Sequence, residues 1–301
     1  SFRVADLGNS RKTAPSFVIP IVKELLDSDI FPILIGKDID GSLAQYQAYR
    51  SRRFVNLAMV DEQIRLDLPT KKKAKDLLLN KILKKRKPSL FQFSHLAFQI
   101  HYTSPKVVDF LHKRLFDPIR LGSVKHQIEK MEPIIRDADL FCFNISALKA
   151  AEAPAQQQPS PSGLTSEEAC QLSRYAGLSD KLTSAGFFGL VPEKDQDGRS
   201  AQVFAQLIWY LIDGFAHRKN DYPVSSEGLV EYVVEFKHSN HEIRFWKSKK
   251  SGRWWIQIPI KKGKKKKSSH YLFPCTYADY QMACQEDLPD RLLNAYKKFS
   301  G

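Results

Sequence analysis

Two hydrophobic periods alternate along roughly the first 220 residues of this chain. Short apolar runs bounded by polar residues predict buried strands at 31–35, 54–60, 90–98, 119–121, 140–145 and 181–190. Between them, apolar residues at helical spacing predict helices at 14–28, 43–49, 71–87, 106–115, 124–131, 166–176 and 201–218. Because strands alternate with helices throughout, the pattern predicts an α/β domain with a mostly parallel sheet covered by helices on both faces.

The strand at Leu140–Ile145 marks the expected position of a site. It is apolar throughout, as a central strand of a parallel sheet is. Thr165 and Glu168 form a capping box that begins the next helix. In open α/β sheets, catalytic and ligand-binding groups lie in loops after the carboxyl ends of strands. Here that position offers Asn144 and Ser146, so the chain forms a platform for a site with few reactive groups on it.

The pattern changes after Tyr222-Pro223. Alternating β-rich runs predict strands at 229–236, 242–246, 254–260 and 271–274, and two helices follow at 277–286 and 290–299. The turn residues 247–252 predict a hairpin between the second and third of these strands. We therefore predict an α/β domain over 1–222 and a β-rich basic appendage over 223–301.

The net charge of +14 is concentrated in two segments. Residues 71–87 hold nine basic residues and one acid, and residues 244–267 hold eleven basic residues and no acid. Such local patches favour an anionic surface as a partner. We predict that a partner binds there through Lys71, Lys72, Lys73, Lys84, Lys85, Arg86, Lys87, Lys249, Lys250, Arg253, Lys264, Lys265, Lys266 and Lys267.

The cysteines and the hydropathy pattern bear on the compartment. Cys142, Cys170, Cys275 and Cys284 are scattered and form no C-x-x-C pair, which is typical of reduced thiols in a cytoplasmic protein. No apolar run approaches the length that spans a bilayer. We therefore predict a cytoplasmic protein.

Five motifs in a fixed order resemble one enzyme family. They are Gly36–Asp40, Asp61–Arg65, Phe143–Ser146, Pro161–Thr165 and Pro192–Ala201. Together they resemble the ureohydrolases (arginase, agmatinase and formimidoylglutamase), and in particular a divergent formimidoylglutamase-like branch. The resemblance spans about residues 5–218. It implies a three-layer α/β/α, arginase-like fold with an eight-stranded parallel sheet, one further strand-helix unit upstream of Ser1, and a homo-oligomer.

The family's reaction uses two Mn²⁺ ions that bridge a hydroxide, which attacks a guanidinium or amidine carbon. Carried over motif by motif, the six metal-ligand positions fall on Ile39, Asp61, Gln63, Arg65, Asn144 and Ser146. Only Asp61 keeps the family's ligand type. Arg65 would place a permanent positive charge where the family holds cations, and the substrate-clamping Glu aligns near Gly189. We therefore expect no cofactor.

These observations leave two readings of the α/β domain. The first is a pseudoenzyme that acts as a cytoplasmic scaffold or interaction protein with a protein partner. The resemblance associates such a partner with a membrane complex of the type IX secretion or gliding machinery. The second is a formimidoylglutamase-like hydrolase of a C–N bond in linear amidines. It would need a remodelled Mn site built from Asp38, Asp40, Asp61 and Glu62. The alternative role of these carboxylates is to cap helices and to pair with Lys37 or Arg65.

A third hypothesis, nucleic-acid binding, rests on the C-terminal segment. Arg244–Lys247 and Arg253–Trp255 interleave aromatic and basic residues beside the lysine-rich 261–267, as nucleic-acid-binding sheets do. The alternative is that these aromatics pack on the body of the domain while the lysines face water. His95 and His101 are expected to be structural.

Overall fold

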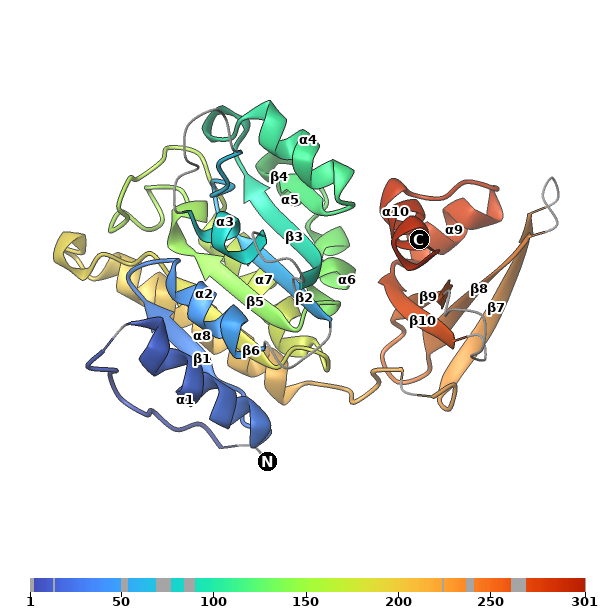
Figure 1. The fold of residues 1–301 in the computed structure, drawn as a ribbon, viewed down its shortest axis with the longest axis horizontal. Helices are drawn as coiled ribbons and strands as arrows, with labels where there is room; N and C mark the ends of the chain where they lie inside the picture. The colour runs from blue at the N-terminus through green and yellow to red at the C-terminus, as the bar shows by residue number, and fades with distance from the viewer. Residues whose placement is uncertain are drawn as a thin grey trace. The chain divides into compact units, whose positions relative to one another are not determined.

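The computed structural model describes residues 3–12, 14–49, 54–68, 77–83, 90–223, 225–236, 241–260 and 269–300. The chain divides into two compact units, Ser1–Arg218 and Lys219–Gly301, and each has its own sheet (Figure 1). The predicted class, an α/β domain with a mostly parallel sheet followed by a β-rich C-terminal part, is confirmed.

The sheet of the first unit is entirely parallel. Its strands run in the order β1-β6-β5-β2-β3-β4, so β5 lies between β2 and β6 as a central strand. Their bounds are β1 (Ile33–Gly36), β2 (Val55–Val60), β3 (Leu90–Phe98), β4 (Asp117–Arg120), β5 (Leu140–Asn144) and β6 (Ser184–Phe188). The resemblance implies eight strands, whereas the described residues of this unit form six.

Helices cover both faces of this sheet, because successive side chains of a strand point to opposite faces. Phe141 and Phe143 of β5 pack in one core with the helices α5 (Leu121–His126), α6 (Met131–Arg136), α7 (Ser166–Leu178) and α8 (Arg199–Ala216). Leu140 and Cys142 pack in the other core with α1 (Pro15–Asp27), α2 (Gly41–Ala48), α3 (Leu78–Leu83) and α4 (Pro105–Lys113). The unit therefore has the predicted three layers (Figure 1).

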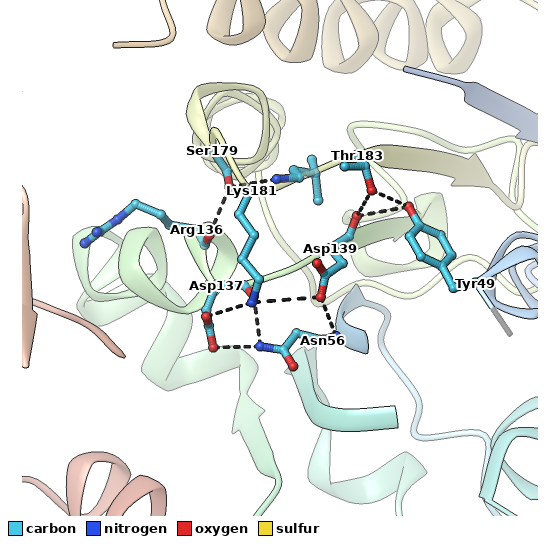
Figure 2. Close-up of polar contacts among 9 residues, drawn as sticks. Tyr49, Asn56, Arg136, Asp137, Asp139, Ser179, Lys181 and Thr183 are labelled. Carbon is cyan, nitrogen blue, oxygen red and sulfur yellow. Dashed lines mark hydrogen bonds and ion pairs between the residues drawn. The ribbon is translucent and has the colours of Figure 1, made fainter. Parts of the chain in front are cut away.

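A buried polar network joins the amino-terminal ends of β2, β5 and β6 (Figure 2). The Lys181 ammonium, ahead of β6, lies 3.0 Å from Asp137 Oδ1 and 3.8 Å from Asp139 Oδ2. Asn56 of β2 donates its side-chain amide to Asp137 Oδ2 and its backbone N–H to Asp139 Oδ2. We call these four residues the Lys181 network. It lies at the opposite end of the sheet from the carboxyl ends of the strands.

The second unit, orange to red in Figure 1, is a four-stranded antiparallel sheet with two helices on one face. Its elements are β7 (Leu229–Phe236), β8 (His241–Ser248), β9 (Trp254–Ile260), β10 (Ser269–Cys275), α9 (Tyr277–Cys284) and α10 (Asp290–Ser300). The predicted hairpin is confirmed as β8 and β9. Phe245 and Ile256 form a core with Ala283 of α9 and Leu292 of α10.

Over the whole part of the chain that the structure describes, no helix is both long enough and apolar enough to cross a bilayer.

Candidate functional site

The loops that follow β2 and β5 meet at the carboxyl-terminal edge of the sheet. These two strands are parallel neighbours, with Val60 opposite Phe143 in the register. Asp61 directly follows β2, and Ser146 lies in a short 3₁₀ turn (Ile145–Ala147) directly after β5. The two positions are 85 residues apart in sequence, and the strand pairing brings them into contact.

Asp61 has both carboxylate oxygens engaged by its own chain. The side chain is fully buried. Ser146 Oγ donates to Oδ1 at 2.8 Å, and Arg65 Nε donates to Oδ2 at 2.9 Å. The backbone N–H of Gln63 lies 3.5 Å from Oδ1. We call Asp61, Arg65 and Ser146 the Asp61 site.

Arg65 supplies the positive charge of this site. Burial is the largest single influence and lowers the pKa of Arg65, but the charge and hydrogen bond of Asp61, together with the charges of Glu62 and Asp40, outweigh it, so the pKa stands above its ordinary value. Its side chain is 33% exposed. The guanidinium is therefore a permanent cation at a position where the resembled family has a carboxylate ligand.

The other positions carried over from the family's motifs offer no reactive group that is free to act, and one of them has no space for a side chain. Asn144 accepts a hydrogen bond from the Ser146 backbone N–H through its Oδ1, at 3.4 Å. Ile39 is buried in the apolar core beside α1 and α2. Gly189, after β6, has φ +94°, and a Cβ built there would lie 2.1 Å from Asn144 Oδ1. There is thus no room for a side chain where the family places its clamping Glu.

Two titratable groups beside Asp61 have strongly shifted pKa values. Burial, reinforced by Asp61 and opposed by Arg65, raises the pKa of Glu62 to about 7. Burial lowers the pKa of His95, on β3, to about 4, and its Nε2 lies 3.1 Å from the Asp61 carbonyl oxygen. Among the described residues, Glu62 Oε2 and His95 Nδ1 have no hydrogen-bond partner. For Glu62 the one signal in the sequence is its place directly after a strand end, which favoured a metal ligand or a capping or ion-pairing carboxylate and did not predict a raised pKa.

The residues present do not fit a metal pair. Across the described ranges, no three His, Cys, Asp or Glu side chains are grouped so as to hold a metal ion. The structure therefore does not gather Asp38, Asp40, Asp61 and Glu62 into one ligand set. Asp61 pairs with Arg65, as the alternative role for these carboxylates anticipated. Asp40 instead lies 3.8 Å from the ammonium of Lys81. Lys37, expected to pair with one of these carboxylates, pairs with Glu193 at 3.2 Å.

The predicted partner-binding residues fall into three groups. Lys249 and Lys250 are exposed in the turn between β8 and β9. Arg253 differs from the expectation: only 12% of its side chain is exposed, and Nη1 lies 3.6 Å from the buried Asp221 Oδ1, because this turn packs on the start of its own unit. The others lie outside the described residues, namely Lys71, Lys72, Lys73, Lys84, Lys85, Arg86, Lys87, Lys264, Lys265, Lys266 and Lys267.

Of the aromatic residues that favoured nucleic-acid binding, Phe245, Trp254 and Trp255 are buried within the second unit, whereas Trp246 is half-buried and donates its Nε1–H to Gln257 Oε1 at 2.8 Å. Trp254 is 5% exposed, stacks on Tyr280 with ring centroids 4.9 Å apart, and has the Lys247 ammonium 5.5 Å from its ring. Phe245 and Trp255 are fully buried. These rings therefore do not provide exposed stacking surfaces, as the alternative interpretation anticipated.

Comparison with known proteins supports the resemblance. Residues 109–213 match the model of the arginase family. A formimidoylglutamase from Staphylococcus haemolyticus is 31% identical over 86 residues, which is 28% of this chain and 28% of that protein. The match thus spans little more than a quarter of that relative's length.

Solved structures extend the likeness to most of the fold. Trypanosoma cruzi formiminoglutamase gives a TM-score of 0.62 at 20% identity, over 70% of this chain and 73% of that one. Formimidoylglutamase from Bacillus subtilis gives 0.59 at 14% identity, over 68% of each chain. Arginase from Bacillus cereus gives 0.56 at 16% identity, over 66% of this chain and 77% of that one. The Trypanosoma cruzi enzyme has been solved with Mn²⁺. The predicted resemblance is confirmed: part of the chain is similar to the arginase family and to a formimidoylglutamase, and the fold is arginase-like.

Proposed function

We propose that this chain is a non-catalytic protein on a ureohydrolase fold, a cytoplasmic scaffold that works through its surface. The observation that carries the proposal is that both carboxylate oxygens of Asp61 already accept hydrogen bonds from the chain itself. Its two oxygens are held by Ser146 and Arg65, so the single retained ligand of the family's motif is bound within the chain.

The chemistry of the site supports the same conclusion. Hydrolysis of an amidine needs an activated water and a group that stabilises charge developing at the attacked carbon. Asp61 is already committed to two donors, and Ile39 offers no polar atom. The Arg65 guanidinium keeps its proton near neutral pH, so it does not serve as a general base. A cationic amidinium substrate would also be repelled by Arg65.

Charge supports an interaction role for the second unit. Residues 219–301 hold sixteen Lys and Arg against nine Asp and Glu. Lys249 and Lys250 are exposed at the turn between β8 and β9. Such a surface favours an acidic partner. In the proposal this is a protein of a membrane-associated complex, of the type IX secretion or gliding kind that the resemblance implies.

Metal analysis tests the non-catalytic part of the proposal. The protein is produced with Mn²⁺ in the medium, purified, and analysed for metal by mass spectrometry, and its hydrolysis of formimidoylglutamate is measured. We expect no stoichiometric metal and no turnover. Two Mn per chain, or turnover above that of buffer, would overturn the proposal.

A charge-reversal pair tests the interaction part. Lys249→Glu with Lys250→Glu should weaken capture of the partner in pull-downs from the source cells. Lys106→Glu with Lys113→Glu, on exposed positions of α4, is the matched control and should not. Equal capture by both variants would count against this surface. Capture that is abolished by nuclease would instead favour nucleic acid.

A further inference from the structure

The Asp61 site joins two loops through one buried carboxylate. A fully buried carboxylate is costly unless it is both hydrogen-bonded and paired with a positive charge. Ser146 supplies the hydrogen bond from the loop after β5, and Arg65 supplies the charge from the loop after β2. The carboxylate therefore holds the ends of two neighbouring strands together.

Three acidic side chains act on the charge of Arg65. The groups whose charges raise its pKa are Asp61, Glu62 and Asp40. Asp61 is the strongest, since it is also hydrogen-bonded to Arg65 Nε. The guanidinium is thus the charge that compensates the buried Asp61 carboxylate, which is the electrostatic role that a bound cation would have.

We infer that Arg65 is a built-in cation: its guanidinium takes the place of a bound cation at Asp61, and its removal opens a site for a small external cation. This inference rests on the proposed non-catalytic function. It goes beyond it by giving Arg65 a structural task, namely joining the loops after β2 and β5 without metal.

Guanidinium suits this task for a physical reason. It is planar, keeps its charge at every accessible pH, and donates directional hydrogen bonds to carboxylates. An Arg65→Ala variant would leave Asp61, with Ser146 still donating to it, facing the emptied space. External guanidinium then binds Asp61 and stabilises the folded state by mass action.

The experiment is thermal unfolding of the full chain with and without added cations. Four proteins are compared: the wild type, Arg65→Ala, Arg65→Lys and Arg174→Ala. The last is the control, since Arg174 makes a more exposed pair with Asp213 at 3.0 Å. Each is measured with a chelator, with millimolar guanidinium chloride and with millimolar MnCl₂.

We expect the wild type and Arg174→Ala to show no increase in melting temperature with either cation. Arg65→Ala should melt several degrees lower and recover part of that loss when guanidinium is added. MnCl₂ should restore nothing, because one carboxylate and one hydroxyl do not form a metal-ligand set. Arg65→Lys, which keeps the charge but loses the planar hydrogen bond, should lie between wild type and Arg65→Ala. If Arg65→Ala does not fold, stabilisation of Arg65→Lys by guanidinium decides the question in its place.

The outcomes separate the two proposals. Stoichiometric Mn in the wild type would overturn the non-catalytic function and this inference together. A metal-free wild type whose Arg65→Ala variant gains nothing from guanidinium would overturn this inference alone. Equal guanidinium responses in Arg65→Ala and Arg174→Ala would also overturn it, because the effect would not be local to Asp61.

Discussion

At the scale of single residues, Glu62 makes the stability of this protein depend on pH near neutrality. Its folded pKa of about 7 lies above its ordinary value of 4.5, so the folded state holds its proton more tightly than the unfolded state. The resulting stabilisation is complete below pH 4.5 and is lost as the pH rises through 7. Glu62→Gln, which does not ionise, should be more stable than wild type near pH 8, by on the order of 1–3 kcal/mol.

Urea unfolding of both proteins near pH 5 and near pH 8 checks this prediction. Near pH 5 the advantage of Glu62→Gln should fall to roughly a quarter of its value at pH 8. His95 acts in the opposite sense: its stabilising contribution is present above pH 6.5 and is lost as the pH falls through about 4. Both proteins retain His95, so its contribution cancels in the comparison. An advantage of the same size at both pH values would show that Glu62 does not titrate in this range.

Gly189 is required by both its conformation and its surroundings. Its φ of +94° strains any L side chain, and a Cβ would lie 2.1 Å from Asn144 Oδ1. We expect Gly189→Ala to destabilise the protein by roughly 2 kcal/mol or more. Gly198→Ala is the matched control. Gly198 also has positive φ (+70°), but a Cβ added there would meet no atom within 4 Å apart from its chain neighbours. It should cost only about 1 kcal/mol. If both variants lose the same free energy of unfolding in chemical denaturation, the contact with Asn144 adds nothing to the cost.

The sequence located this site but not its internal bonds. The run at 140–145 predicted a central strand, and the rule for open sheets placed chemistry after it. The motif comparison also identified the positions of Arg65 and Ser146. The bond between Ser146 and Asp61 depends on which strands are neighbours, and the chain pattern does not fix that order. The burial of Arg253 against Asp221 was missed for the same reason, since the two are far apart in sequence.

At the scale of elements, the Lys181 network holds the amino ends of three central strands in register. Lys181 is 13% exposed, and Asp137 is 5% exposed. Lys181→Met keeps much of the side-chain volume but leaves Asp137 and Asp139 without their cation. Breaking a buried pair in this way should cost roughly 3 kcal/mol in the free energy of unfolding.

Lys125→Met provides the comparison for Lys181→Met. Lys125 pairs with Glu168 at 2.8 Å, but its side chain is 33% exposed, so solvent screens the pair. Its loss should be less than about 1 kcal/mol in the same urea titration. If the two variants unfold at the same urea concentration, the Lys181 network does not stabilise the sheet as argued.

The elements themselves were largely predictable, because long periodic segments carry a strong hydrophobic signal. The helix α6 (Met131–Arg136) is an exception. It was not foreseen beyond Met131, and it contains Pro133 in its first turn, where the missing N–H has no helical partner to lose. The number of strands is a second exception: the resemblance implied eight, whereas the described part of the first unit has six.

At the scale of the whole molecule, the described residues of each unit form a hydrophobic core within that unit. Phe143 belongs to a core of the first unit, and Ile256 belongs to the core of the second. Both are fully buried. A domain with its own core can unfold as its own cooperative unit. Calorimetry should therefore resolve two transitions.

Core truncations assign the two transitions. Ile256→Ala and Phe143→Ala should each cost about 3–4 kcal/mol, because each removes buried apolar volume and leaves a cavity. Ile256→Ala should lower the melting temperature of one transition, and Phe143→Ala should lower that of the other. If both variants instead lower the melting temperature of a single shared transition, the two cores unfold together. The basic C-terminal unit is then an integral part of the fold rather than a separate binding module. Two independent transitions would mean that the surface carrying Lys249 and Lys250 can change without loss of the α/β unit, as a binding role on a non-catalytic scaffold requires.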